Sequence, residues 1–251
     1  MLASEIRANA RRALQGKWGK GALIVLTYLL IMLAISWVLT KLSIVGEIID
    51  LIISVPISYG IMASFIKLKR GEEVKYTGFL SEGFSKFGRT WGVFGHTLLK
   101  MVVPVILIIA CFMLYSFSVY RMAAEVISNE TGGSGIAVIA TIGLIVSIIY
   151  AIVKGLLYSL TNYILYDNPN MSGKEIVEES ERLMRGNRWN YVWLTLTFIG
   201  WLILCAFTFY IGAFWLMPYV SVSTVCFYEA LAGKDSNEAV VEEVNDNPIS
   251  E

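Results

Sequence analysis

Five ionisable residues interrupt otherwise apolar stretches of the sequence, and they offer the first chemical hint. They are Glu47, Asp50, Lys100, Lys154 and Glu229. A charge inside a membrane is costly, so such a residue is a candidate for a functional site by default. At about 1.5 Å of rise per helical residue, both lysines and Glu229 reach similar depths if these stretches are membrane spans. We therefore predict an ion pair between Lys154 and Glu229, with Lys100 as the alternative partner.

Other interpretations of these charges are open at this stage. Either lysine could extend its ammonium group to the lipid headgroups instead of pairing, or it could serve a substrate or an ion. Glu47 and Asp50 lie near the end of their apolar stretch. They are either hydrated there or paired with Lys41 or Arg121, and a functional role is a further alternative.

Small side chains recur at four-residue intervals in two of the apolar stretches. Such stripes allow two helix backbones to approach closely in lipid. Close packing within a helical bundle is the expected role, and the alternative is a polar cleft that contains Asp50. The first stripe consists of Gly143, Ser147, Ala151, Gly155 and Ser159, and the second of Gly46, Asp50, Ser54 and Ser58.

Three prolines, Pro56, Pro104 and Pro218, also fall inside apolar stretches. Proline removes a backbone donor and clashes with the preceding helical turn, so each of them predicts a kink. A broken helix can form a binding site in a transporter. Pro218 and the adjacent Tyr219 are the position at which we consider such a notch.

The residue types that most hydrolytic and metal chemistries require are missing from the sequence. It has one histidine, His96, and three widely spaced cysteines, Cys111, Cys205 and Cys226. There is no CxxC pair, no phosphate-binding glycine-rich loop and no nucleophile motif. We therefore expect no catalytic residue, no metal and no cofactor, and we expect that the protein is not an enzyme.

The composition points to a helical membrane protein. Of 251 residues, 56% are hydrophobic and only 16% are charged, whereas soluble proteins have about 25% charged residues. A disordered chain and an ordinary soluble enzyme are thereby excluded. Because one crossing needs about 20 apolar residues, the sequence predicts an all-α, polytopic membrane fold with six transmembrane helices. The predicted spans are residues 20–40, 44–66, 95–118, 136–160, 191–209 and 213–231, within a transmembrane domain over residues 19–232.

The segments outside the spans have patterns of their own. Residues 1–18 predict an amphipathic helix that lies on the membrane surface, because its basic residues avoid its apolar face. Residues 77–88 and 172–185 predict short cytoplasmic helices, the second of which starts with a Ser-x-x-Glu capping box. Residues 233–251 are rich in Asp and Glu, and we expect them to form a disordered tail.

Basic residues are distributed unevenly between the two ends of the predicted spans. They gather before the first span, between the second and third, and between the fourth and fifth, with Lys41 and Arg121 on the opposite side. Since basic loops stay in the cytoplasm, both termini are expected there. Their position beside the spans favours contact with lipid headgroups over contact with nucleic acid.

Several sequence motifs follow one another in a characteristic order. They are Glu5-Ile6-Arg7 with Trp18-Gly19, Gly83-Phe84 with Phe87, Tyr158-Ser159-Leu160-Thr161 with Asp167-Asn168-Pro169, Leu183-Met184 with Gly186-Asn187, Phe198-Ile199-Gly200-Trp201, and Pro218-Tyr219. In these motifs the chain resembles the bacterial multi-pass membrane family catalogued as domain of unknown function nine-seven-five. The resemblance implies a protein of the bacterial plasma membrane. It transfers no catalytic residue, because that family has none assigned.

Three classes of function are compatible with these patterns. The favoured one is a non-enzymatic scaffold, assembly or interaction protein that contacts membrane lipids and a protein partner at its cytoplasmic loops. The alternative is a transporter or permease component with a polar site among kinked helices, and a lipid-acting membrane enzyme is the third class. A transporter should contain a hydrated cavity, whereas a scaffold should be dry throughout. The sequence leaves the oligomeric state open.

Overall fold

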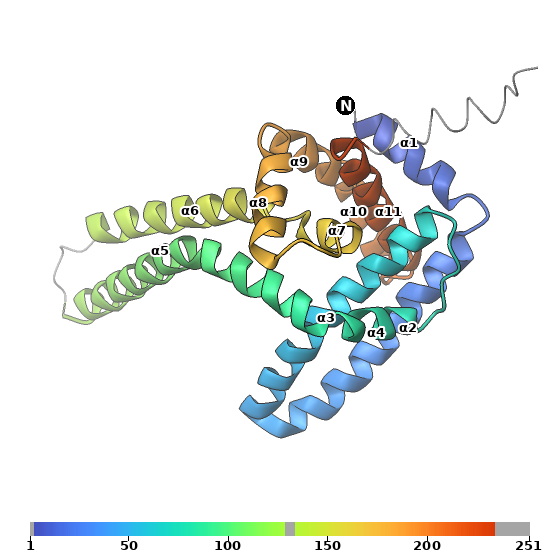
Figure 1. Cartoon of the computed structure of the whole chain (residues 1–251). Coiled ribbons are helices and arrows are strands. Elements are labelled where there is room, and N and C mark those ends of the chain that lie inside the picture. Colours follow the sequence, from blue (N-terminus) through green and yellow to red (C-terminus); the bar gives the residue numbers. More distant parts are fainter. Residues whose placement is uncertain (1–2, 129–133, 234–251) are drawn as a thin grey trace, which may run out of the picture.

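The computed structural model describes residues 3–128 and 134–233 of the chain. Every regular element within these residues is a helix, which confirms the all-α prediction (Figure 1). In chain order the elements are α1 (Ala3–Leu14), α2 (Trp18–Leu39), the 3₁₀ turn η1 (Thr40–Leu42), α3 (Ser43–Lys69), α4 (Gly78–Ser85), α5 (Phe87–Ser128), α6 (Ser134–Leu156), α7 (Thr161–Asp167), α8 (Gly173–Met184), α9 (Arg188–Leu196), α10 (Ile199–Phe207) and α11 (Ala213–Leu231).

Four stretches of the described chain are long and apolar enough to cross a membrane. They are Trp18–Lys69, Phe87–Ala124, Gly135–Asp167 and Arg188–Phe207. The first of them contains both α2 and α3, joined by η1. These stretches support the prediction of a membrane protein, while the number of six spans and their orientation stay predictions.

One part of the molecule, which we call the body, holds most of the buried side chains. It consists of α1, α4, α7, α8, α9, α10 and α11 with the adjoining ends of α2, α3 and α5 (Figure 1). Its central helix is α11, which packs against α1, α2 and α3. Burial of apolar side chains is the main source of folding stability, so the body is the stable centre of the structure.

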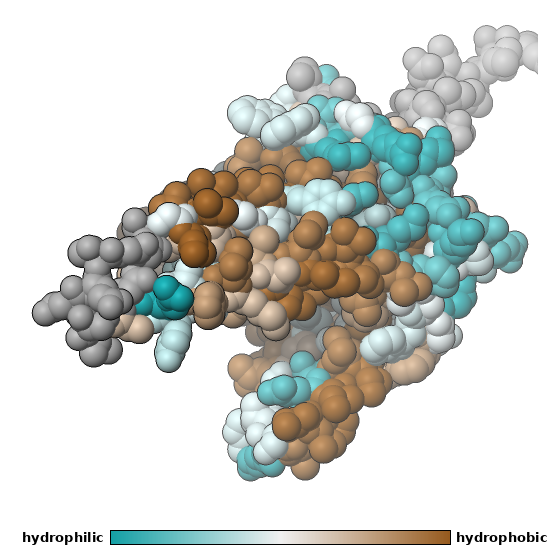
Figure 2. All heavy atoms as spheres, turned by 90° about the vertical axis from the view of Figure 1, so that its left-hand side faces the viewer, coloured by the Kyte–Doolittle hydropathy of each residue, from teal (hydrophilic) through white to brown (hydrophobic). Residues whose placement is uncertain are grey.

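Two helical hairpins project from the body in different directions (Figure 1). The first arm comprises residues 26–55 of α2, η1 and α3, and the second arm comprises the described residues between 94 and 156 in α5 and α6. Most of their large apolar side chains are exposed. Figure 2 shows hydrophobic residues over the projecting parts, while hydrophilic residues gather along one side of the body. Arms of this kind require an apolar solvent.

The small residues of α6 lie within the second arm. A Cβ atom added to Gly143 would lie 3.4 Å from the Cys111 sulfur of α5. Ser147 is buried and Ala151 is half-buried. A Cβ atom added to Gly155 would lie 4.0 Å from the Met101 methyl group. Ser159 lies beyond α6 and bonds to the Leu156 carbonyl. Asp50 belongs to the first arm, so the α6 stripe does not share a cleft with it, whereas Gly46 and Asp50 of the second stripe border a pocket of their own.

Two glycines allow α3 and α4 to touch through their backbones. A Cβ atom at Gly60 of α3 would lie 1.8 Å from the Phe79 carbonyl oxygen. One at Gly83 of α4 would lie 2.3 Å from the Pro56 carbonyl oxygen. Any side chain at either position would therefore force the two helices apart. Pro56, Pro104 and Pro218 all lie inside helices, namely α3, α5 and α11.

Several predicted boundaries differ from the observed ones. The helix that contains predicted span 95–118 is longer and runs from Phe87 to Ser128. Predicted span 136–160 leaves the helical conformation after Leu156, where α6 ends. Predicted span 191–209 is split into α9 and α10 at Thr197 and Phe198. Of the predicted acidic tail, residues 234–251 lie outside the described residues.

The predicted capping box begins α8. The Ser172 hydroxyl accepts a hydrogen bond from the Glu175 backbone amide, and the Glu175 carboxylate accepts one from the Ser172 amide. The helix ends before Gly186, whose φ of +84° suits glycine best. Its apolar face, which includes Ile176 and Val177, is buried in the body. Local sequence signals therefore define this helix at both ends.

Candidate functional site

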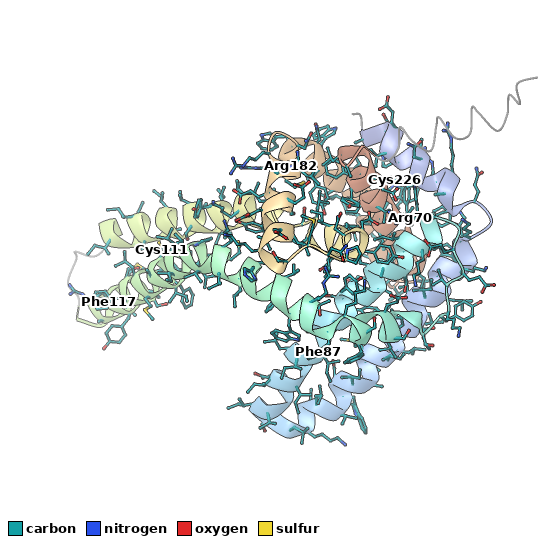
Figure 3. The ribbon with its side chains drawn as sticks, viewed as in Figure 1. Arg70, Phe87, Cys111, Phe117, Arg182 and Cys226 are labelled. Carbon is teal, nitrogen blue, oxygen red and sulfur yellow. The ribbon has the colours of Figure 1, made fainter. Side chains whose placement is uncertain are left out.

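Four charged side chains, Lys69, Arg70, Asp167 and Glu229, meet in the body where α3 ends, and we call them the base cluster. Lys69 Nζ lies 2.6 Å from Glu229 Oε2. The guanidinium of Arg70 donates to both carboxylate oxygens of Asp167, at 2.8 and 3.0 Å, and through Nε to Glu229 Oε1 at 3.0 Å. Figure 3 shows Arg70 at the end of α3, among the elements of the body. Two cations thus neutralise two carboxylates.

Three helices supply the base cluster from distant parts of the sequence. Lys69 and Arg70 end α3, Asp167 ends α7, and Glu229 lies in the last turns of α11. Basic residues at the C-terminal end of α3 also oppose the negative end of its helix dipole. The cluster therefore fixes the mutual positions of three elements that no sequence motif connects.

The two carboxylates of the base cluster are almost completely buried. The Asp167 and Glu229 side chains are 4% and 2% exposed, respectively. A buried charge is tolerated only when it is paired and hydrogen-bonded, and the two-pronged contact from Arg70 to Asp167 is the strong form of such a bond. Removal of one partner would leave an uncompensated charge in the body.

Aromatic rings surround the base cluster. The Tyr228 hydroxyl forms a hydrogen bond with Asp167, and the Tyr166 ring lies 5.7 Å from the Arg70 guanidinium carbon. Burial alone would lower the pKa of Arg70, but its hydrogen bonds to Asp167 and Glu229 outweigh burial and raise the pKa. Arg70 is thus held in its charged form, as a lasting structural contact requires.

The expected ion pair between Lys154 and Glu229 is wrong, because Lys69 and Arg70 occupy the Glu229 carboxylate. The position of a residue along its helix predicts its depth in a membrane, but it does not predict which helices are its neighbours. α11 packs against α1, α2 and α3, whereas α6, which carries Lys154, packs against α5. The alternative partner, Lys100, lies 4.0 Å from Glu181 of α8.

Lys100 and Lys154 instead lie near α8. The charges of both lysines act on the Glu181 carboxylate, and Arg185 donates a hydrogen bond to it at 3.0 Å. The hydrogen bond from Arg185 lowers the pKa of the Glu181 carboxyl group, against the effect of burial. Glu181 therefore attracts the basic residues at the junction of the second arm and the body.

Glu47 and Asp50 lie near the tip of the first arm. Both border a pocket of about 310 Å³, together with Thr40 and Ser43. Glu47 is exposed, whereas Asp50 is half-buried. Lys41, one of their expected partners, lies over the Trp37 ring at 3.9 Å instead.

Our interpretation of the sequence missed three of the four residues in the base cluster. In the sequence, Lys69 and Arg70 belong to the basic residues between the second and third predicted spans, and Asp167 belongs to a family motif. The signal that the sequence offers is that each of these charges lies at the end of an apolar stretch. Glu229 was the one member identified as a candidate.

Comparisons with known proteins agree with the resemblance in the motifs. A family model described as "Protein of unknown function (DUF975)" matches residues 1–235. Neither a curated protein nor a solved structure matches the chain. Since the matched residues include every helix described above, the chain belongs to the DUF975 family of proteins of unknown function.

Proposed function

We propose that this protein is a non-enzymatic scaffold of the bacterial plasma membrane, with both termini in the cytoplasm. Its body would lie at the cytoplasmic face, and its arms would be embedded in lipid. A protein partner would contact the cytoplasmic loops, of which α8 is the most charged. No nucleic acid, metal or cofactor is needed for this role.

The base cluster is the observation that carries the proposal. Its cations and carboxylates are paired with one another inside the body, so their charge is used to hold α3, α7 and α11 together. A catalytic or transporting carboxylate needs access to a substrate or to water, which the exposed fractions of Asp167 and Glu229 do not provide. The buried and mutually paired charges of the base cluster thus support a structural role, in which the protein is a rigid scaffold.

A test of this proposal is the accessibility of cysteines placed within the apolar helices. Single cysteines at Ser58 and Ser147 would be introduced into a chain in which the three native cysteines are replaced by alanine. The protein would be reconstituted in lipid vesicles and treated with a membrane-impermeant thiol reagent on either side. A scaffold predicts no labelling, whereas labelling at both positions would show a hydrated path and contradict the proposal.

The transporter alternative has one specific observation in its favour. Asp50 is half-buried, its Oδ1 atom has no hydrogen-bond partner among the described residues, and it borders a pocket. A cysteine at Ser54, one helical turn further along α3, would sharpen the distinction. Labelling that extends from Ser54 to Ser58 would favour transport, and labelling that stops before Ser54 would restrict water to the tip of the arm.

A further inference from the structure

A second pocket lies at the junction of α1, α10 and α11. Its volume is about 480 Å³. Two arginines of α1 border one part of it, and aromatic and aliphatic side chains of the other helices border the rest. The residues that matter for the argument are Arg7, Arg11, Trp18, Trp201, Leu204 and Trp215. None of them belongs to the base cluster.

The two arginines are spaced to act together. Arg7 and Arg11 are four residues apart in α1, so they lie on the same face of that helix. Arg11 donates to the Tyr219 hydroxyl of α11 at 2.8 Å, a bond that orients it but does not neutralise it. Arg7 has a buried Nε atom without a hydrogen-bond partner among the described residues. Within the part of the chain that the structure describes, no ion pair neutralises Arg7 or Arg11, so this part of the pocket offers two guanidinium groups to an anion.

The remaining walls of the pocket are apolar. Leu204 and Trp201 come from α10, and Trp215 comes from α11. About half of each tryptophan side chain is exposed, 52% for Trp201 and 51% for Trp215. Tryptophan prefers the level of the lipid headgroups. The pocket thus combines a cationic end with an apolar wall that opens outward.

We propose that this pocket binds one anionic phospholipid. Arg7 and Arg11 would hold the phosphate, because guanidinium matches phosphate through paired hydrogen bonds. One acyl chain would lie against Trp201, Leu204 and Trp215. A soluble anion would leave the apolar wall without an occupant, and an uncharged lipid would leave the two guanidinium groups without one. The proposal requires membrane insertion of the arms but not the scaffold role.

The test counts lipids that stay bound to the full chain. Native mass spectrometry of protein from detergent micelles would compare dioleoyl phosphatidylglycerol with dioleoyl phosphatidylcholine. We expect one retained phosphatidylglycerol and clear selectivity over phosphatidylcholine. The variant with both Arg7→Gln and Arg11→Gln should lose affinity about tenfold or more, because it removes the charge-assisted hydrogen bonds to the phosphate. Unchanged selectivity in this variant would overturn the proposal.

A matched control lies on the same helix. Arg12 is exposed and does not border the pocket, so Arg12→Gln removes one positive charge from α1 and should leave the selectivity unchanged. An equal loss in Arg12→Gln would show general charge attraction and contradict a built site. Leu204→Trp leaves both arginines in place and adds bulk to the apolar wall. The pocket becomes narrower, so the variant should also retain less lipid. Unchanged retention in Leu204→Trp would exclude the acyl-chain position.

Two further experiments test for other occupants of the pocket. Competition by inorganic phosphate at the lipid concentration would show a site for a free anion and contradict the phospholipid. The acidic residues after Gly233 lie outside the described residues and are the alternative anionic occupant. A full chain with Asp235, Glu238, Glu242, Glu243, Asp246 and Glu251 changed to their amides is therefore compared. If this chain alone retains lipid, the tail is the occupant. Labelling of the single cysteines introduced at Ser58 and Ser147 would contradict the scaffold role. It would leave the expected results of the lipid-binding experiments unchanged.

Discussion

The body and the two arms both carry many large apolar side chains, but they use these side chains in opposite ways. In the body, Phe79 is completely buried, and Val222 and Val225 of α11 are as well. In the second arm, Phe117 is 55% exposed and Phe112 is 57% exposed. Side chains of one kind are thus hidden by protein in one region and presented to the surroundings in the other. The body would keep its shape through internal contacts, whereas the arms depend on lipid.

Charge follows the same division. The body contains the base cluster, in which Arg70 connects Asp167 and Glu229. The first arm carries Glu47 and Asp50 near its tip, far along α3 from Lys69. Buried and paired charges impose one arrangement on the body, while the arms carry little that would fix their directions. Substitutions should therefore have large effects in the body and small effects in the arms.

The largest effect is expected from the loss of Arg70. Arg70→Gln leaves two buried carboxylates with fewer partners, which should lower the free energy of unfolding by about 3–5 kcal/mol. Thermal unfolding in detergent micelles measures this loss. The control is Arg182→Gln, which removes an exposed pair with Glu179 and should leave the midpoint unchanged. Similar midpoints for both variants would remove the distinction between buried and exposed charge.

The same truncation in both regions tests the comparison most simply. Phe79→Ala should cost about 3–5 kcal/mol, because it leaves a cavity in the body. Phe117→Ala should stay within about 0.5 kcal/mol, because its ring is exposed. Denaturant titrations of the two variants give both values. Equal losses would mean that the arm is packed as tightly as the body.

A smaller effect is expected at the contact between α3 and α4. Gly60→Ala places a methyl group against the Phe79 carbonyl and should cost about 1–3 kcal/mol through overpacking. Gly95 of α5 has no atom within 4 Å of an added Cβ, so Gly95→Ala should gain up to about 1 kcal/mol from helix propensity. Opposite shifts of the unfolding midpoint are the expected result. Stabilisation by Gly60→Ala would show that the two backbones do not touch.

The capping box of α8 should contribute less again. Ser172→Ala removes the acceptor for the Glu175 amide and should cost about 1 kcal/mol. Hydrogen exchange of the first turn of α8 would detect the loss locally. Ser81 of α4 bonds only to the Gly78 carbonyl of its own helix, and Ser81→Ala should leave exchange in α8 unchanged. Unchanged exchange in Ser172→Ala would dismiss the box as a stabilising element.

The smallest effect is a pH dependence at the junction of body and second arm. The pKa of Glu181 is lowered by its hydrogen bond from Arg185, so the ionised carboxylate stabilises the folded chain. This stabilisation is present above the ordinary pKa of 4.5 and is lost as the pH falls through the lowered value. The midpoints of the natural chain and Glu181→Gln should differ at pH 7 and converge in acid. A constant difference would assign the effect to packing.

Some of this organisation could be predicted from the sequence, because it depends on local patterns. The lengths of the apolar stretches predicted the long helices, and the capping box at Ser172 and Glu175 predicted α8. The base cluster could not be predicted in the same way. Depth along a helix places Glu229 and Lys154 at one level, but it does not say which helices are neighbours. That choice depends on how α11 fits between α1, α2 and α3, including the close contact of Gly21 with Pro218.

The most direct test of the division into body and arms is the membrane side on which each part is exposed. Single cysteines at Glu178 of α8, at Thr40 in the first arm and at Tyr120 near the end of α5 in the second arm would be introduced into a cysteine-free chain. Intact cells and inverted vesicles would be treated with an impermeant thiol reagent. The account predicts labelling of the Thr40 and Tyr120 positions in intact cells and of the Glu178 position only in inverted vesicles. Labelling of all three positions from one side would contradict it.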